Sequence, residues 1–238
     1  MTQTIEEKIL TKEKAKNLLE KYEHLKRYGY NFYHELQKID KKEKGIDEKC
    51  HSLVIAMLLN AKNQKEDDIR YCFLKNFINS LNDCQNIDFN KLISDINVEV
   101  EHKTNNNSSI DILLYSNNAS FVCVIENKID CELGESQLKK YKTYIEESEK
   151  FSNYKYKNYV YLRRYLNTMN TSDIRQIQEN NYQEFEYSDL TKMINDDCLE
   201  KTENKKFSLN IAQYKEFIDL YWYDTVDGYY IEDVKKYL

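Results

Sequence analysis

The sequence predicts an α/β protein with a mixed central β-sheet and flanking helices, and three observations support this. Runs rich in β-branched and aromatic residues, typical of strands, occupy residues 96–128 in the middle of the chain. An amphipathic helical pattern at 134–150 follows them, and a further strand pattern at 159–166 comes next. Apolar residues at spacings of three and four fill both ends of the chain. A hairpin joined through a crossover helix to a returning strand contains antiparallel and parallel pairs, which makes the sheet mixed.

Helical patterns precede the predicted sheet. Residues 6–41 place apolar side chains at helical spacing among Lys and Glu, which indicates one or two amphipathic helices. After the break at Gly45, residues 50–60 are apolar on nearly all sides, so we expect a helix buried under the sheet. Another helix is expected at 67–81. The segment 82–95 is polar and is expected to be a short link to the first strand.

The chain beyond the last predicted strand is helical again. After a polar stretch, residues 185–196 open one helix, and residues 207–222 form a strongly amphipathic one. The length of 238 residues fits one domain with decorations. We divide this single domain, residues 1–238, into an N-terminal helical extension (1–45), a core (46–195) and a C-terminal helical region (196–238).

Composition restricts the function classes. The formal net charge of −6 argues against a protein that coats nucleic acid non-specifically, so any contact with nucleic acid is expected to be local. The six cysteines contain no CxxC pair and no Cys/His cluster, which argues against a zinc site. The N-terminus lacks the apolar core of a signal peptide, and no apolar run approaches membrane-spanning length. We therefore expect a cytoplasmic protein with no membrane contact.

Charged residues punctuate the two hairpin strands. Asp111 lies near the start of the first, and Glu126 and Lys128 end the second. With Asn117-Asn118 as a two-residue turn, facing residue numbers sum to about 235, which sets Asp111 opposite Val124. Side chains alternate with period two, so the two acids and the lysine share one face. Two carboxylates and an ammonium are costly to hold together unless a cation lies between the acids, and a divalent metal is the usual answer.

A surface salt bridge at the end of a hairpin is the alternative, because an Asp followed later by Glu-x-Lys is a weak pattern. The run VCVIENK favours a site, since an apolar strand stops at Glu126. The next helix adds Gln137 and Tyr141, which are four residues apart and share a face; a solitary Gln could also point to water. Upstream, Glu48 could reach the same cluster, whereas His51 is more simply a capping or core-edge residue.

The segment 154–165 interleaves Lys and Arg with aromatic rings, a combination that suits neutralisation of a nucleic-acid backbone and base stacking. Arg163 and Arg164 belong to this segment. We name them, together with Lys140 and Tyr141 of the preceding helix, as candidate contacts to nucleic acid. A solvated strand edge protected by its charges is the alternative interpretation.

Several motifs, in chain order, resemble those of the PD-(D/E)XK nuclease superfamily. They are DEKCHSLVIAMLLN, IDILL, VIENKID, GESQLKKYKTYI, VYLRRYL and QYKEFIDLY. The E-N-K run and a helix-borne Gln followed by Tyr are most similar to a bacterial branch of this group. Ile110 stands where the family name has Pro, a position that is not chemically engaged. The resemblance implies a restriction-endonuclease-like core and a metal-dependent nuclease that hydrolyses phosphodiester bonds.

The same resemblance implies Mg²⁺ or Mn²⁺ as cofactor, DNA rather than RNA as substrate, and a role in defence against foreign DNA. No separate target-recognition domain is evident, so sequence-specific cleavage would need a homodimer or a partner protein. Two alternatives stay open: a catalytically silent binding protein of this fold, and an effector nuclease activated by a partner or ligand. The implied roles are Glu48 as upstream acid, Asp111 and Glu126 as metal ligands, Lys128 beside the attacking water, and Gln137 as a helix-borne site residue. From the way an ion would be held there, we expect the backbone carbonyl of Asn127 to be a further metal ligand.

Overall fold

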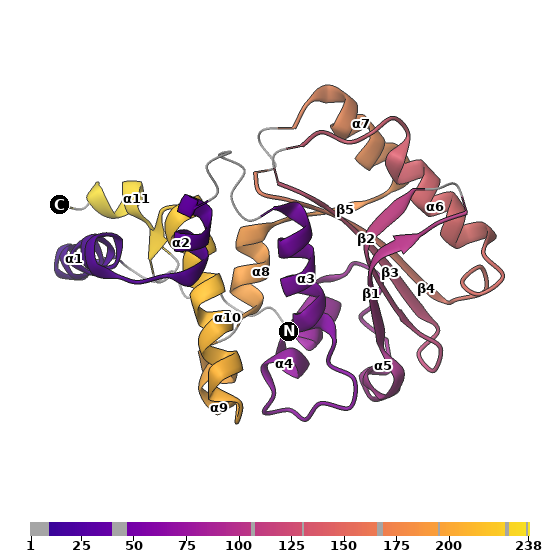
Figure 1. Ribbon diagram of the computed structural model, residues 1–238, viewed down its shortest axis with the longest axis horizontal. Coiled ribbons are helices and arrows are strands. Elements are labelled where there is room, and N and C mark those ends of the chain that lie inside the picture. Colours follow the sequence, from indigo (N-terminus) through magenta and orange to yellow (C-terminus); the bar gives the residue numbers. More distant parts are fainter. Residues whose placement is uncertain are drawn as a thin grey trace.

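The fold is organised around one five-stranded β-sheet. The computed structural model describes residues 10–39, 47–105, 108–129, 131–165, 169–194, 196–226, 229–236 and 238. The strands, in spatial order, are β1 (Asn97–Lys103), β2 (Ser109–Ser116), β3 (Phe121–Lys128), β4 (Tyr156–Arg163) and β5 (Gln183–Glu186) (Figure 1). The first three pair antiparallel, whereas β3, β4 and β5 pair parallel. The mixed sheet that the sequence predicts is confirmed.

Helices cover both faces of the sheet, as predicted (Figure 1). One face carries α6 (Gln137–Glu147) and α7 (Thr171–Asn180), and the other carries α3 (Glu48–Leu59), α4 (Ile69–Ser80) and α8 (Tyr187–Met193). The remaining elements are α1 (Lys12–Tyr28), α2 (Phe32–Ile39), α5 (Phe89–Asp95), α9 (Asp196–Lys201), α10 (Lys205–Phe217), the π-helix η2 (Ile218–Trp222), the two-stranded ribbon β6 (Thr225–Val226) and β7 (Tyr229–Tyr230), and α11 (Ile231–Lys235).

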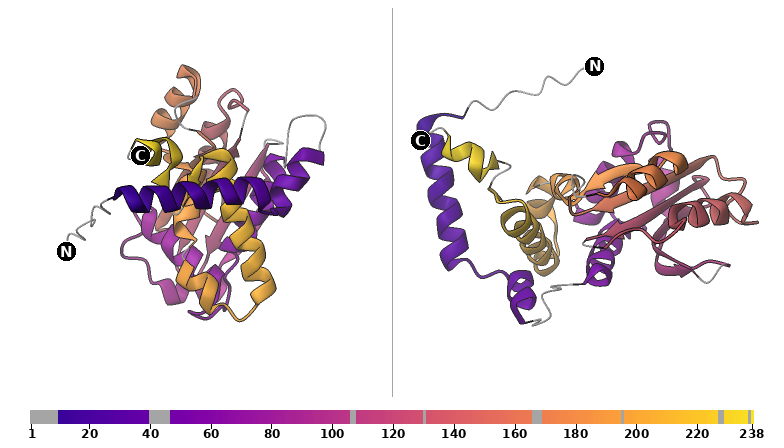
Figure 2. Two further views of the ribbon diagram at one scale, coloured as in Figure 1. Left: turned by 90° about the vertical axis from the view of Figure 1, so that its left-hand side faces the viewer. Right: turned by 90° about the horizontal axis from the view of Figure 1, so that it is seen from above.

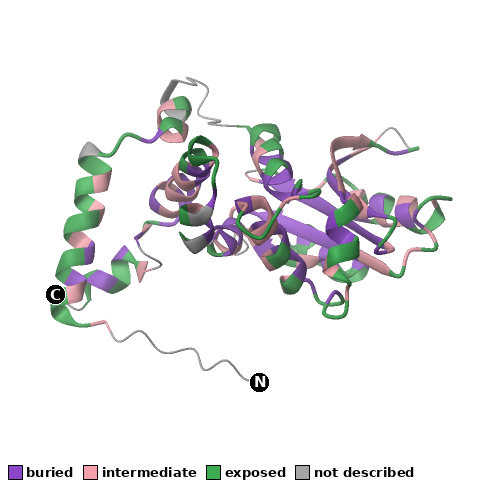
Figure 3. Ribbon diagram, turned by 90° about the horizontal axis from the view of Figure 1, so that it is seen from below, coloured by how far each residue is buried: buried purple, intermediate pink, exposed green. Residues whose placement is uncertain are grey.

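Strand β3 lies at the centre of the sheet and is buried along its whole length (Figure 3). Its side chains alternate between two hydrophobic cores. Val124 packs in the core that contains Leu138 of α6, whereas Ile125 packs in the larger core that contains Ile55 of α3. Because both faces are covered by helices, the strand reads as a continuous apolar run until its charged end.

The turn between β2 and β3 differs from the predicted one. Ser116 pairs with Phe121, so residues 117–120 form a four-residue turn instead of a two-residue turn. When this register is continued, Asp111 lies opposite Glu126, whereas the predicted turn set it opposite Val124. A shift by an even number of residues keeps every side chain on its face. Asp111 therefore remains on the predicted side of the sheet.

The N-terminal helical segment and the C-terminus pack together at the end of the molecule away from the sheet, beyond α10 (Figure 2). The predicted helical region divides into α1 and α2 at Gly29, where an added Cβ would lie 2.5 Å from the carbonyl oxygen of Leu25. A third hydrophobic cluster joins α1 to α11 and β6. The predicted break at Gly45 lies outside the described residues. Among the described helices, none combines the length and apolar character that crossing a bilayer requires.

The prediction of a helix buried on all sides is wrong in part. Leu53 and Met57 of α3 are 55% and 40% exposed, so one stripe of this helix faces solvent. The polar link also contains a helix, α5, because Asp88 caps it by accepting hydrogen bonds from the backbone N–H groups of Asn90 and Lys91. The sequence prediction further missed α7, α9 and β5, which are short and polar.

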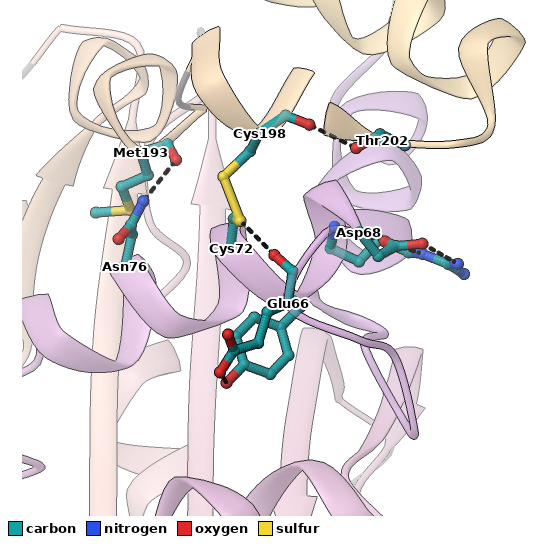
Figure 4. Close-up of a disulfide and its surroundings, with 9 residues drawn as sticks. Glu66, Asp68, Cys72, Asn76, Met193, Cys198 and Thr202 are labelled. Atoms are coloured by element: carbon teal, nitrogen blue, oxygen red, sulfur yellow. Dashed lines mark hydrogen bonds and ion pairs between the residues drawn. A yellow bond between two sulfur atoms is a disulfide. The ribbon is translucent and has the colours of Figure 1, made fainter. Parts of the chain in front are cut away.

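A disulfide links Cys72 of α4 to Cys198 of α9 (Figure 4). Beside it, the Asn76 side chain donates a hydrogen bond to the Met193 carbonyl oxygen at 3.0 Å. These contacts fasten the C-terminal helices to α4. By contrast, Cys123 is a free, buried thiol in the large core, where it packs as a small hydrophobic residue.

Candidate active site

The charged end of β3 meets the start of β2 and the first turn of α3. Glu126 is fully buried, and the ammonium of Lys128 lies 2.8 Å from its Oε1 atom. The same ammonium lies 3.2 Å from Oε1 of Glu48, the first residue of α3. The backbone N–H of Ile129 donates to the other carboxylate oxygen of Glu48 at 3.1 Å. The structure thus places Glu48 beside Lys128 and Glu126, the cluster that we expected it to reach.

Gln137, at the start of α6, bonds the same oxygen of Glu126 that the Lys128 ammonium contacts. Its Nε2 donates to Glu126 Oε1 at 2.6 Å and to the hydroxyl of Tyr141 at 2.8 Å, and its Oε1 accepts from the backbone N–H of Gly134. Tyr141 in turn donates to the Ser109 carbonyl oxygen at 2.5 Å. Gln137 therefore points into the site rather than to water.

Electrostatics at this end of the sheet are dominated by buried acid. Burial raises the pKa of Asp111 to about 6, against the hydrogen bond that its Oδ2 accepts from the Asn127 backbone N–H at 2.8 Å. Burial and the neighbouring Asp111 carboxylate raise the pKa of Glu126 well above its usual value. Burial alone would lower the pKa of Lys128, but Glu126, Glu48 and Asp111 together raise it.

The donor set fits a hard divalent cation held by two carboxylates. The second carboxylate oxygen of Glu126, Oε2, is buried and has no hydrogen-bond partner. The Asp111 carboxylate acts on the pKa of Glu126, so the two acids lie close to one another. Among the described residues, no group of three or more His, Cys, Asp or Glu side chains is arranged to hold a metal by itself. Mg²⁺ suits such a site because it keeps several waters and takes few protein ligands.

A cavity of about 260 Å³ leads to Asp111 from the surface, between the first turn of α3 and β1. Glu101 lines this cavity from β1. It has a left-handed backbone (φ 55°) and faces Asp111 in the register, and its Oε2 lies 3.6 Å from Nζ of Lys49. Ser52 lines the cavity as well. Sequence reasoning missed both residues, because nothing in the local pattern marks a Glu with a left-handed backbone or a helix-borne Ser as part of a site.

A larger cavity of about 680 Å³ lies between α1, α8 and α10. In it, the ammonium of Lys215 pairs with Asp219 at 2.8 Å, and Asp219 also accepts a hydrogen bond from Thr191. These charges compensate one another, whereas acids outnumber cations in the smaller cavity. The chemistry therefore points to the smaller one.

The four candidate nucleic-acid contacts have different surroundings. Lys140 is exposed, although its ammonium also donates to the Glu135 carbonyl oxygen. Tyr141 is buried in the network described above. Arg163 is 5% exposed and lies 3.3 Å from Asp173, and the guanidinium of Arg164 stacks on Trp222 at 4.6 Å from the ring centre. Tyr141 and Arg163 thus have internal partners, and Lys140 is the one of the four candidates that is exposed.

Comparison with known protein families gives a match over most of the chain. Residues 30–216 match the family model described as the PD-(D/E)XK nuclease superfamily. Searches of curated proteins and of solved structures give no significant match. The matched segment contains all five strands and every site residue described above.

Proposed function

Because the chain belongs to the PD-(D/E)XK nuclease superfamily, we propose that it is a divalent-metal-dependent nuclease with its active site at the charged end of β3. The observation that carries this proposal is the buried excess of acid. Asp111 and Glu126 lie together with raised pKa values, and one buried oxygen of Glu126 has no partner. A fold retains such an arrangement at a cost in stability, which a bound cation would offset.

Asp111 and Glu126 are the residues that would hold Mg²⁺ or Mn²⁺. When bound, such an ion supplies charge neutralisation and a water of lowered pKa. Lys128 is placed to orient a water or to stabilise negative charge that develops on the phosphate. Gln137 fixes the orientation of the Glu126 carboxylate. Glu48 holds the Lys128 ammonium from the side of α3.

We propose DNA as the substrate, in a role that would include defence against foreign DNA; the resemblance to the family is what supports both. The net charge of −6 requires that contact be local. The exposed Lys140 on α6 and Lys49 beside the cavity are the cations best placed to meet a phosphate backbone. A homodimer or partner protein would supply any sequence specificity.

The test is a cleavage assay on the purified protein. Linear, circular and single-stranded DNA and an RNA are incubated with Mg²⁺ or Mn²⁺, beside an Asp111→Ala variant and an Asp83→Ala variant as matched control, since Asp83 is exposed. We expect cleavage by the wild type and by Asp83→Ala only. Equal cleavage by Asp111→Ala would indicate a contaminating nuclease. Cleavage of no substrate with either ion would contradict the proposal and favour a protein that only binds.

A further inference from the structure

The middle residue of the E-N-K run points away from the acids. Asn127 is fully buried, and its side chain lies on the face of the sheet that α3 and α8 cover. The amide nitrogen donates to Ser52 Oγ at 3.0 Å and to the Glu48 carbonyl oxygen at 3.1 Å. Both acceptors belong to the first turns of α3. The amide of Asn127 therefore ties that helix to β3.

Tyr187, the first residue of α8, supplies the hydrogen-bond donor for the amide oxygen of Asn127. Its hydroxyl donates to Asn127 Oδ1 at 2.7 Å, which satisfies the side-chain oxygen. The ring is fully buried and makes an edge contact with Trp222 at 5.0 Å between ring centres. The hydroxyl is held in place, because the ring has little room to move in a close-packed core.

The bonds of Asn127 connect to the acids through the backbone. Glu126 and Lys128 are its chain neighbours, and its N–H donates to Asp111 Oδ2 at 2.8 Å. The Glu48 carboxylate meets Lys128 from the helix that the Asn127 amide holds. Loss of the side-chain bonds of Asn127 would therefore loosen α3 against β3, and through the backbone of Asn127 it would also loosen the N–H that holds Asp111.

We propose that Tyr187 is a positioning residue for the acid site and acts through the side chain of Asn127, a role that rests on the proposed function. Without the hydroxyl, the buried Oδ1 of Asn127 loses its donor, and the amide can turn away from Ser52. Groups that orient metal ligands from behind commonly change metal affinity or activity by ten- to a hundredfold when they are removed. We expect an effect of about tenfold, at the lower end of this range. Tyr187 does not bond the acids itself: its hydroxyl bonds Asn127, whose backbone N–H in turn bonds Asp111.

The experiment compares Tyr187→Phe with Tyr214→Phe. Tyr214 is a matched control: it is also buried, and its hydroxyl bonds Nδ1 of His51 on α3 at 2.7 Å, but among the described residues no hydrogen bond joins it to β3. Each variant loses one buried hydroxyl from the same core. Tb³⁺ is titrated as a hard-cation probe, with tyrosine-sensitised luminescence as the readout, and Mn²⁺ affinity is obtained by competition. Where the wild type cleaves plasmid DNA, kcat and KM are measured as well.

We expect Tyr187→Phe to weaken Tb³⁺ and Mn²⁺ binding about tenfold and to lower kcat with KM for DNA unchanged, whereas Tyr214→Phe stays near the wild type at a similar loss of Tm. Equal affinity in all three proteins, or equal losses in both variants, would overturn the proposal. If Tyr187→Phe does not fold, Ser52→Ala removes a bond to the same amide and carries the same expectation. A wild type that binds Tb³⁺ but cleaves nothing contradicts the nuclease function, while the affinities still decide the role of Tyr187.

Discussion

Two buried cations occupy facing positions on neighbouring parallel strands, and their surroundings differ. Lys128 of β3 pairs in register with Arg163 of β4. The guanidinium of Arg163 lies 3.3 Å from one carboxylate, that of Asp173, and receives further support from the hydroxyl of Tyr161. The ammonium of Lys128 contacts the carboxylates of both Glu126 and Glu48, and the charge of Asp111 acts on it as well.

The number of carboxylates around each cation distinguishes a structural ion pair at Arg163 from a candidate active site at Lys128. One positive and one negative charge compensate each other at Arg163, so the interior needs no additional ion there. At Lys128, acids outnumber the cation, and burial raises the pKa of Asp111 and Glu126. An uncompensated buried charge of this kind is a functional signal, because a fold selected for stability alone would remove it.

The largest effect is expected from replacing the unbalanced cation. Lys128→Met should lower the rate of DNA cleavage about a thousandfold, because the group that we propose to stabilise charge on the phosphate is lost. Binding of Tb³⁺ should be largely intact, since the two proposed ligands remain. Steady-state kinetics and a luminescence titration measure the two quantities. Wild-type turnover in this variant would remove Lys128 from the mechanism.

The matched change at the balanced pair should act on stability instead. Arg163→Met leaves Asp173 buried without its partner, and we expect a loss of about 3 kcal/mol in the free energy of unfolding. Activity per folded molecule should change by no more than about twofold. Denaturant titration followed by cleavage assays at low temperature checks both. A thousandfold loss of activity without destabilisation would erase the distinction between the two cations.

The next effect in size is expected in the pH dependence of stability, and it comes from Asp111. The pKa of Asp111 is raised from 3.8 to about 6 in the folded state. Protonated Asp111 therefore contributes stability below about pH 4, and this contribution, on the order of 3 kcal/mol, is lost as the pH rises through 6. Added Mn²⁺ should stabilise the folded protein only above about pH 6, because the cation needs the ionised carboxylate. Thermal melts across pH 4–8, with and without Mn²⁺, would show this crossing; a stabilisation by Mn²⁺ that is independent of pH would contradict it.

The smallest effect is a gain in stability. Asp111→Asn removes one charge from the excess but retains an acceptor for the Asn127 N–H. Without divalent cations at neutral pH, the variant should be more stable than the wild type by about 1 kcal/mol, while it fails to bind Tb³⁺. Asp173→Asn provides the contrast, because the same change at the balanced pair should destabilise. If both variants change the free energy of unfolding in the same direction, the acids around Lys128 are not in excess.

Alternation along the strands was enough to predict which acids share a face. Asp111, Glu126 and Lys128 belong together because side chains repeat every two residues, and the misjudged turn did no harm because its error was even. The turn is longer because Asp95 accepts hydrogen bonds from the backbone N–H groups of Asn117 and Asn118, a contact across more than twenty residues. No local pattern contains such a contact.

Partners of buried charges could not be predicted in the same way. The pattern of 154–165 shows cations among aromatic rings, but it does not show that Arg163 pairs with Asp173 from α7, a helix that the sequence analysis missed. Tyr187 reaches Asn127 from 60 residues along the chain. Tertiary packing decides which charge is neutralised and which stays open, and that information is spread over the whole fold.

The bond between Cys72 and Cys198 closes a covalent ring whose ends are 126 residues apart in the chain. All five strands fall inside that ring, and Glu48 lies outside it. An unfolded but oxidised chain would keep the sheet segments tethered, and a link of this length can lower the entropy of the denatured ensemble by an amount worth roughly 4–5 kcal/mol. Thiol reductants should therefore reduce the tolerance of this protein to heat while leaving the acids and the lysine of its sheet in place.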